Sequence, residues 1–115
     1  MSRSSTDSGV AKRRQHAAMF AALGDETRLS LVAALASGEP RSIAQLSGGA
    51  RITRQAITKH LRVLEQAGIV HSTRTGRESL FGFDPAPMQE LEEYLQRVAA
   101  QWDEVLARLK AFVES

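Results

Sequence analysis

The sequence predicts a mostly α-helical protein with a small β-hairpin wing, the winged helix-turn-helix arrangement. Apolar residues recur at helical spacing between residues 12 and 67 and again between 86 and 113, whereas residues 69–83 follow a period near two. Helix-capping residues and glycines separate the helical stretches. A capped short helix, a tight connection, a second helix and a hairpin follow one another in the order that this fold requires.

Length and composition narrow the class of protein. The 115 residues suit one domain, which we expect over residues 12–115 after a disordered polar arm over residues 1–11. No apolar run is long enough to cross a membrane, and the first residues lack the apolar middle of a secretion signal, so we expect a soluble, cytoplasmic protein. The absence of cysteine excludes disulfides and thiolate metal sites, and the three histidines are scattered, so no metal or other cofactor is predicted.

Capping residues and glycines predict where the first three helices begin and end. The first runs from Lys12 to Leu23 and is followed by Gly24, and the second follows an N-cap at Asp25 and ends at Gly38. Ser42 with Gln45 three residues later predicts a capping box for a short third helix. The apolar face predicted for the second helix comprises Leu29, Val32, Ala33, Leu35 and Ala36.

The fourth helix, about residues 53–67, is the candidate recognition helix. Thr53 is its predicted N-cap and Gly68 its left-handed C-terminal residue. Its predicted apolar side comprises Ala56, Ile57, Leu61, Leu64 and Ala67. The runs "IVHSTR" and "ESLFGF" then predict a hairpin wing over about residues 69–83, with its turn at Gly76.

The last helix, about residues 86–113, carries an apolar seam at alternating steps of four and three. A helix of this length must bury such a seam, and we expect it to do so in a homodimer interface rather than by packing within one chain. Trp102 on the seam is interpreted as interface core, with an apolar effector pocket as the alternative. The predicted interface residues on this helix are Leu91, Leu95, Val98, Trp102, Val105, Leu109 and Phe112. Met19, on the first helix, is also predicted to lie at the interface.

Charge is unevenly distributed along the chain. Residues 51–77 carry six basic side chains against Glu65 alone, a formal charge of +5, whereas residues 86–115 carry −3. A basic segment on a separate scaffold is typical of a polyanion-binding surface, although charge alone is also compatible with ordinary solvated faces.

The polar face of the fourth helix offers groups that read DNA. Arg54 and Gln55 are the candidates for direct base contacts, because arginine pairs with guanine and glutamine with adenine through two hydrogen bonds. Thr58 and Lys59 can read bases or hold phosphate. Phosphate contacts are expected from Arg51, Arg62, Arg74 and Arg77, with the minor groove as an alternative for Arg77.

Four segments together resemble the ArsR-type (ArsR/SmtB) winged-helix repressors. They are "FAALGDETRLSLVAAL", "SIAQLSGGARITRQAITKHLRVLEQAGIV", "RTGRESLFGFDPAPMQELEEYL" and "QWDEVLARLKAF", which span about residues 15–113. The resemblance implies a homodimer with N- and C-terminal helices at its interface, which binds an inverted-repeat operator in double-stranded DNA and represses transcription. It adds His60 to the recognition-helix positions, so the predicted DNA-contacting set is Arg51, Thr53, Arg54, Gln55, Thr58, Lys59, His60, Arg62, Arg74 and Arg77.

The chain departs from the metal-sensing members of that family. Its third helix, "SIAQLSGG", has no thiol, and its last helix has carboxylates but no histidine, a poor donor set for zinc or copper. We therefore expect a regulator that does not respond to metal through the family's usual sites, and the sequence leaves open whether a small-molecule effector exists. The alternative is a winged-helix protein-interaction module without sequence-specific DNA binding. An enzyme is not expected, because no catalytic constellation is present.

Overall fold

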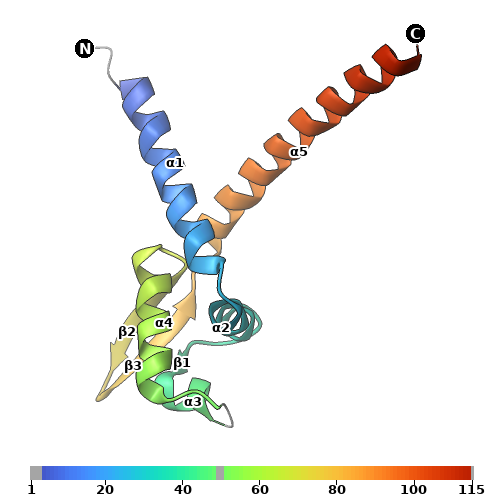
Figure 1. Ribbon diagram of the computed structural model, residues 1–115. Coiled ribbons are helices and arrows are strands. Elements are labelled where there is room, and N and C mark those ends of the chain that lie inside the picture. The colour runs from blue at the N-terminus through green and yellow to red at the C-terminus, as the bar shows by residue number, and fades with distance from the viewer. Residues whose placement is uncertain (1–3, 49–50, 115) are drawn as a thin grey trace. The chain divides into compact units, whose positions relative to one another are not determined.

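The computed structural model describes residues 4–48 and 51–114 and forms two compact units, one up to Pro85 and one from Ala86 onward. The elements, shown in Figure 1, are α1 (Ser4–Leu23), α2 (Glu26–Ala36), β1 (Arg41–Ser42), α3 (Ile43–Ser47), α4 (Arg54–Gln66), β2 (Val70–Thr75), β3 (Glu78–Phe83) and α5 (Pro85–Glu114). The prediction of a mostly helical winged helix-turn-helix is confirmed.

α1 is longer at its N-terminus than the sequence indicated. The structure has helix from Ser4, whereas a disordered arm was predicted over residues 1–11; residues 1–3 lie outside the described part of the chain. Residues 4–11 are poor helix formers, but they contain no proline, so nothing stops the helix from continuing backward from its apolar half. That apolar half buries Met19 and Ala22 completely or nearly so.

The predicted N-caps of the helices are confirmed. Asp25 accepts a hydrogen bond from the Arg28 amide at 3.0 Å, and Thr53 accepts one from the Ala56 amide at 3.1 Å. Ser42 and Gln45 form the full capping box, because each side chain accepts from the backbone amide of the other. These contacts fix the chain direction on entry to α2, α3 and α4.

The core of the N-terminal unit lies between α4 and the elements that contact it, α1, α2, α3 and β2. Ile57, Leu61 and Leu64 on α4 are at most 1% exposed, as predicted. In α2 the prediction was partly wrong, because Leu31 is buried, whereas Leu29 is 52% exposed and Ala33 and Ala36 are exposed as well. Residues 31–36 read "LVAALA", and a run without polar interruption does not indicate which helical face turns inward.

The wing belongs to a three-stranded antiparallel sheet with the order β1-β3-β2. Gly76 has φ 63° and begins the two-residue turn of the hairpin, a position that requires a residue tolerant of positive φ. The sequence did not predict β1, which pairs Arg41 with Phe81 and Ser42 with Leu80. A two-residue strand is too short to show an alternating pattern.

The C-terminal unit is the single helix α5. Its seam is largely exposed in the isolated chain: Leu95, Trp102, Val105 and Leu109 are between 42% and 61% exposed. Leu106, Phe112 and Val113 add further exposed apolar surface. No helix in residues 4–48 or 51–114 is long and apolar enough to cross a membrane.

Candidate nucleic-acid interface

The N-terminal half of α4 presents a polar surface because its apolar side is used in the core. Thr53, Arg54, Gln55, Lys59 and Arg62 are exposed, as is Arg51 just before the helix. Since Ile57, Leu61 and Leu64 lie on the opposite side, the helix is held by its inner face while its outer face is accessible. α3 contacts α4 and completes the helix-turn-helix.

An open depression of about 560 Å³ follows the first turns of α4. The helix depression, as we call it, is lined by Thr53, Gln55, Ala56, Thr58 and Lys59. The Thr58 hydroxyl donates a hydrogen bond to the Arg54 carbonyl oxygen at 2.7 Å, so its proton is already used. Thr58 therefore offers a ligand a methyl group and an acceptor oxygen, while Gln55 and Lys59 offer donors.

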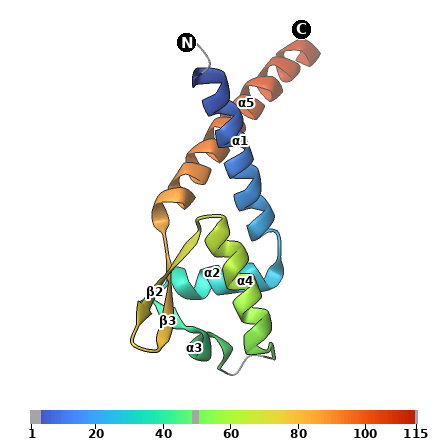
Figure 2. The same ribbon diagram turned by 90° about the vertical axis from the view of Figure 1, so that its left-hand side faces the viewer.

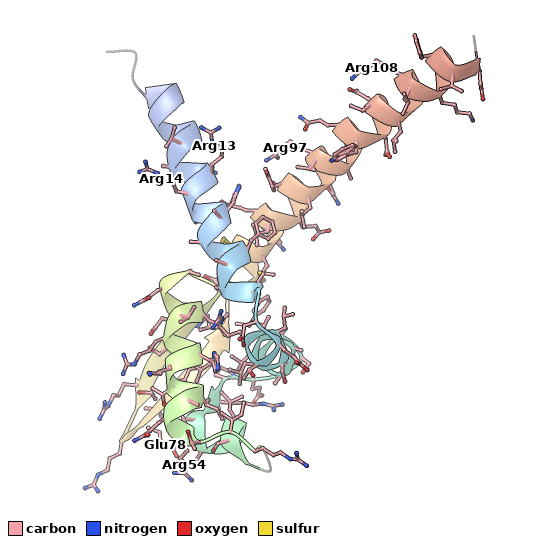
Figure 3. The ribbon with its side chains drawn as sticks, in the orientation of Figure 1. Arg13, Arg14, Arg54, Glu78, Arg97 and Arg108 are labelled. Carbon is pink, nitrogen blue, oxygen red and sulfur yellow. The ribbon has the colours of Figure 1, made fainter. Side chains whose placement is uncertain are left out.

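A second groove, of about 320 Å³, joins α4 to the wing. This wing groove is lined by Ser42, Ile43, Ala44, Arg54, Arg77, Glu78 and Ser79. Arg54 enters it from the start of α4 and Arg77 from the turn of the hairpin, and Figure 3 shows Arg54 and Glu78 at the same end of the N-terminal unit. Two guanidinium groups from different elements suit an anionic ligand, and Glu78 is the acidic group beside them.

The hairpin extends the basic surface. Arg74 and Arg77 are exposed in β2 and in the turn that follows it. Figures 1 and 2 show α4 running beside the hairpin, with the N-terminus of α4 and the hairpin turn toward the same end of the N-terminal unit. Eight of the ten residues predicted to contact DNA are exposed, and Thr58 lines the helix depression.

His60 is the exception. Its side chain is 24% exposed and faces the start of α2, where Nδ1 lies 3.2 Å from Nη1 of Arg28 and 3.9 Å from Oδ2 of Asp25. In the folded chain, His60 therefore contacts the start of α2 and not the open polar face of α4. The partner Arg28 was missed at the sequence level, because it is 32 residues from His60 and no local pattern links the two.

The electrostatics at this corner are set by Asp25. The hydrogen bond from the Arg28 amide lowers the pKa of the Asp25 carboxyl from its ordinary value of 3.8; partial desolvation opposes the shift, and the charge of the Arg28 side chain adds to it. The N-cap of α2 is therefore an ionised carboxylate at neutral pH.

One of the predicted interface residues, Met19, is fully buried in the folded chain. The exposed part of the predicted set begins at Leu95.

Among residues 4–48 and 51–114, no group of three or more histidine, aspartate or glutamate side chains is arranged to hold a metal ion.

A helix-turn-helix whose second helix exposes a polar N-terminal half, next to a basic hairpin, defines a winged helix-turn-helix DNA-binding protein. The family model described as a helix-turn-helix domain matches residues 23–73, which include α2, α3, α4 and the start of the wing. The HTH-type transcriptional regulator YuzN of Bacillus subtilis (strain 168) is 39% identical over 80 residues, which cover 64% of this chain and 87% of YuzN.

The structure of an ArsR-like transcriptional regulator from Rhodococcus sp. RHA1 has a TM-score of 0.79 and 34% identity, and covers 89% of this chain and 95% of that protein. The chain belongs to the ArsR-like family of winged helix-turn-helix transcriptional regulators. It is thus a DNA-binding regulator and not an enzyme.

A more distant structure shares the fold. Mb0332 from Mycobacterium bovis, a homodimeric winged helix-turn-helix DNA-binding domain, has a TM-score of 0.64 and 23% identity, and covers 80% of this chain and 84% of that fragment.

Proposed function

We propose that the protein is a homodimeric repressor that binds an inverted-repeat operator, with one α4 helix in each of two successive major grooves. The observation that carries this proposal is the helix depression, where Gln55 and Lys59 lie on an open surface at the N-terminal end of a helix whose other face is buried. An α-helix presented in this way fits the major groove of B-DNA.

Base reading is assigned to the first turn of α4. Gln55 can pair with adenine through two hydrogen bonds, and Arg54 with guanine, at the edges exposed in the major groove. Thr58 supports the same assignment through its methyl group, which suits an apolar contact with the thymine methyl, since its hydroxyl proton is bound to the Arg54 carbonyl.

Phosphate contacts are assigned to the rim. Arg51 and Arg62 flank the base-reading turn, and Arg74 and Arg77 extend from the hairpin; all four side chains are exposed. Such contacts set the orientation of the protein on the duplex and supply the salt-dependent part of the affinity.

Dimerisation is assigned to α5. A 30-residue helix with Leu95, Trp102, Val105 and Leu109 exposed on its seam gains free energy by burying that seam against a second copy, since each large apolar side chain contributes about 1.5–3 kcal/mol on full burial. The homodimeric state of Mb0332, which shares the fold, supports the assignment. Two-fold symmetry of the protein then requires two-fold symmetry in the operator.

The proposal is tested by selecting bound duplexes from a random pool. We expect an inverted repeat whose half-sites are about one helical turn, 10–10.5 base pairs, apart, and two protomers per duplex by sedimentation. The matched control is the Arg54→Ala, Gln55→Ala protein, which should bind the pool without enriching a sequence. Enrichment of one unrepeated site bound by one protomer would contradict the dimer, and no enrichment by the unmodified protein would contradict sequence-specific binding.

A further inference from the structure

The side chain of Arg28 in α2 joins three helices. Its Nε donates a hydrogen bond to the carbonyl oxygen of Ala22 at 2.5 Å and its Nη2 donates to that of Ala21 at 3.4 Å, both in the last turn of α1. Its Nη1 lies 3.2 Å from Nδ1 of His60, in the middle of α4. One guanidinium group therefore connects α1 and α2 to the helix that carries the DNA-reading residues.

The Arg28–His60 contact has a chemical requirement. A guanidinium group has donors but no acceptor, so Nδ1 of His60 must accept, and the imidazole must be neutral with its proton on Nε2. A protonated imidazole has no free lone pair and would carry the same charge as Arg28. The contact in the structure is thus specific to one protonation state of His60.

A second partner with the opposite requirement lies close to the same atom. Oδ2 of Asp25 is 3.9 Å from Nδ1 of His60, and this oxygen already accepts the amide of Arg28 at 3.0 Å as the N-cap of α2. A carboxylate accepts and does not donate, so it suits the protonated imidazole. The two partners of His60 thus sit side by side, one for each protonation state.

We propose that His60 is a positioning residue of the DNA-reading helix and exchanges partners with its protonation state, resting on Arg28 when neutral and on Asp25 when protonated. Closing the 3.9 Å separation to hydrogen-bond length requires a shift of the His60 ring or of the Asp25 carboxylate, by side-chain rotation or by movement of α4 toward the start of α2. The exchange breaks the Arg28 contact that holds α4 on α1 and α2, and so changes how Gln55 and its neighbours are positioned. Mild acid should therefore weaken operator binding.

The other charged or titratable groups around α4 do not provide an equivalent pair of partners. On β2, Ser72 donates to Oε2 of Glu65 at 2.6 Å, while His71 and Arg74 are exposed. α3 contains no titratable side chain, and α1 contributes the buried His16. Lys59 and Arg62 belong to α4 itself and are exposed. His60 is the titratable group of α4 that lies within reach of both a donor and a carboxylate.

The inference rests on the proposed operator binding, and the His60→Asn protein tests it. The Asn amide oxygen can accept from Arg28 in place of Nδ1, but it does not titrate. Between about pH 8 and pH 6, operator affinity of the unmodified protein should fall about tenfold, within the range of linked sites. Affinity of His60→Asn should stay level. The control His71→Asn, altered on the exposed wing strand, should keep the fall.

A measurement without DNA separates this inference from the proposed function. The ¹⁵N resonances of the His60 ring should report the Nε2–H tautomer at about pH 8 in the free protein, because Nδ1 accepts from Arg28. The Arg28→Met protein should lose this preference and, at pH 8, bind operator as weakly as the unmodified protein does at pH 6. Finding the Nδ1–H tautomer, or an equal fall with pH in His60→Asn and the unmodified protein, would overturn the inference. If no variant selected an operator, the proposed function would be contradicted instead. The His60 tautomer measured in the free protein would still show whether Nδ1 accepts a hydrogen bond from Arg28.

Discussion

Arg54, the first residue of α4, and Glu78, the first residue of β3, line the same groove. A carboxylate therefore lies among the arginines that we assign to DNA. Its charge opposes phosphate, and it lowers attraction to any duplex regardless of sequence.

Replacing Glu78 with Gln should accordingly tighten binding to both operator and scrambled duplex. We expect an increase of about threefold to tenfold for each duplex, as for one rim charge in a complex dominated by electrostatics, with the relative preference for operator unchanged. Fluorescence anisotropy at two salt concentrations measures both. Glu39→Gln, which removes a charge from the exposed α2–β1 connection, is the matched control and should leave both affinities unchanged. Weaker binding by Glu78→Gln would show instead that Glu78 itself accepts a hydrogen bond from a base.

Substitutions at Gln55 and at Arg74 should reduce DNA affinity in different ways. Gln55→Ala should reduce operator affinity by about 1–3 kcal/mol and leave scrambled DNA unaffected, since it removes a base contact. Arg74→Ala should weaken both duplexes equally and reduce the slope of log affinity against log salt by about 1. Titrations of the two proteins at a series of salt concentrations distinguish these patterns. A uniform loss in Gln55→Ala would move that residue from base reading to phosphate contact.

Leu109→Glu should separate the proposed dimer. A charge placed in an apolar interface is not compensated, so we expect the dimer dissociation constant to rise about a hundredfold or more. Sedimentation equilibrium measures the change, and circular dichroism checks that α5 stays helical. Arg108→Ala alters the adjacent exposed position, outside the apolar seam, and should remain dimeric. A dimer that persists in Leu109→Glu would place the interface elsewhere.

Asp25→Asn should alter how stability depends on pH. Because the folded state lowers the pKa of Asp25, its ionised form stabilises the fold above the ordinary value of 3.8, and this contribution is lost as the pH falls below that value. Asn is also a good N-cap but carries no charge. The melting temperature of the unmodified protein should therefore exceed that of Asp25→Asn at neutral pH, and the two should converge in acid. A constant difference across the range would mean that the carboxylate charge plays no part.

The features that the sequence predicted correctly are those encoded locally. Ser42 and Gln45 are three residues apart, and the caps at Asp25 and Thr53 act within one helical turn, so each can be recognised without knowledge of the fold. The same holds for the hairpin turn at Gly76. The polar outer face of α4 followed from the apolar residues on its inner face.

The features that were missed depend on distant partners. His60 looked like part of the polar face of α4, but its position is explained by Arg28, which only the folded chain brings near. Met19 has the same apolar character as Leu95 or Leu109, and its burial cannot be read from helical spacing. Likewise, β1 forms by pairing with β3, which is distant from it in the sequence.

Ser42 is at once the last residue of β1, paired with Leu80 in β3, and the N-cap of α3. One residue therefore ends the edge strand β1 and begins the helix-turn-helix. A chimera that exchanges the wing between two relatives must therefore include residues 41–42 together with the hairpin, although 27 residues separate them from its first strand. A graft limited to the hairpin would pair the new β3 with the original β1, and the mismatch would reach α4 through α3, the helix that Ser42 caps.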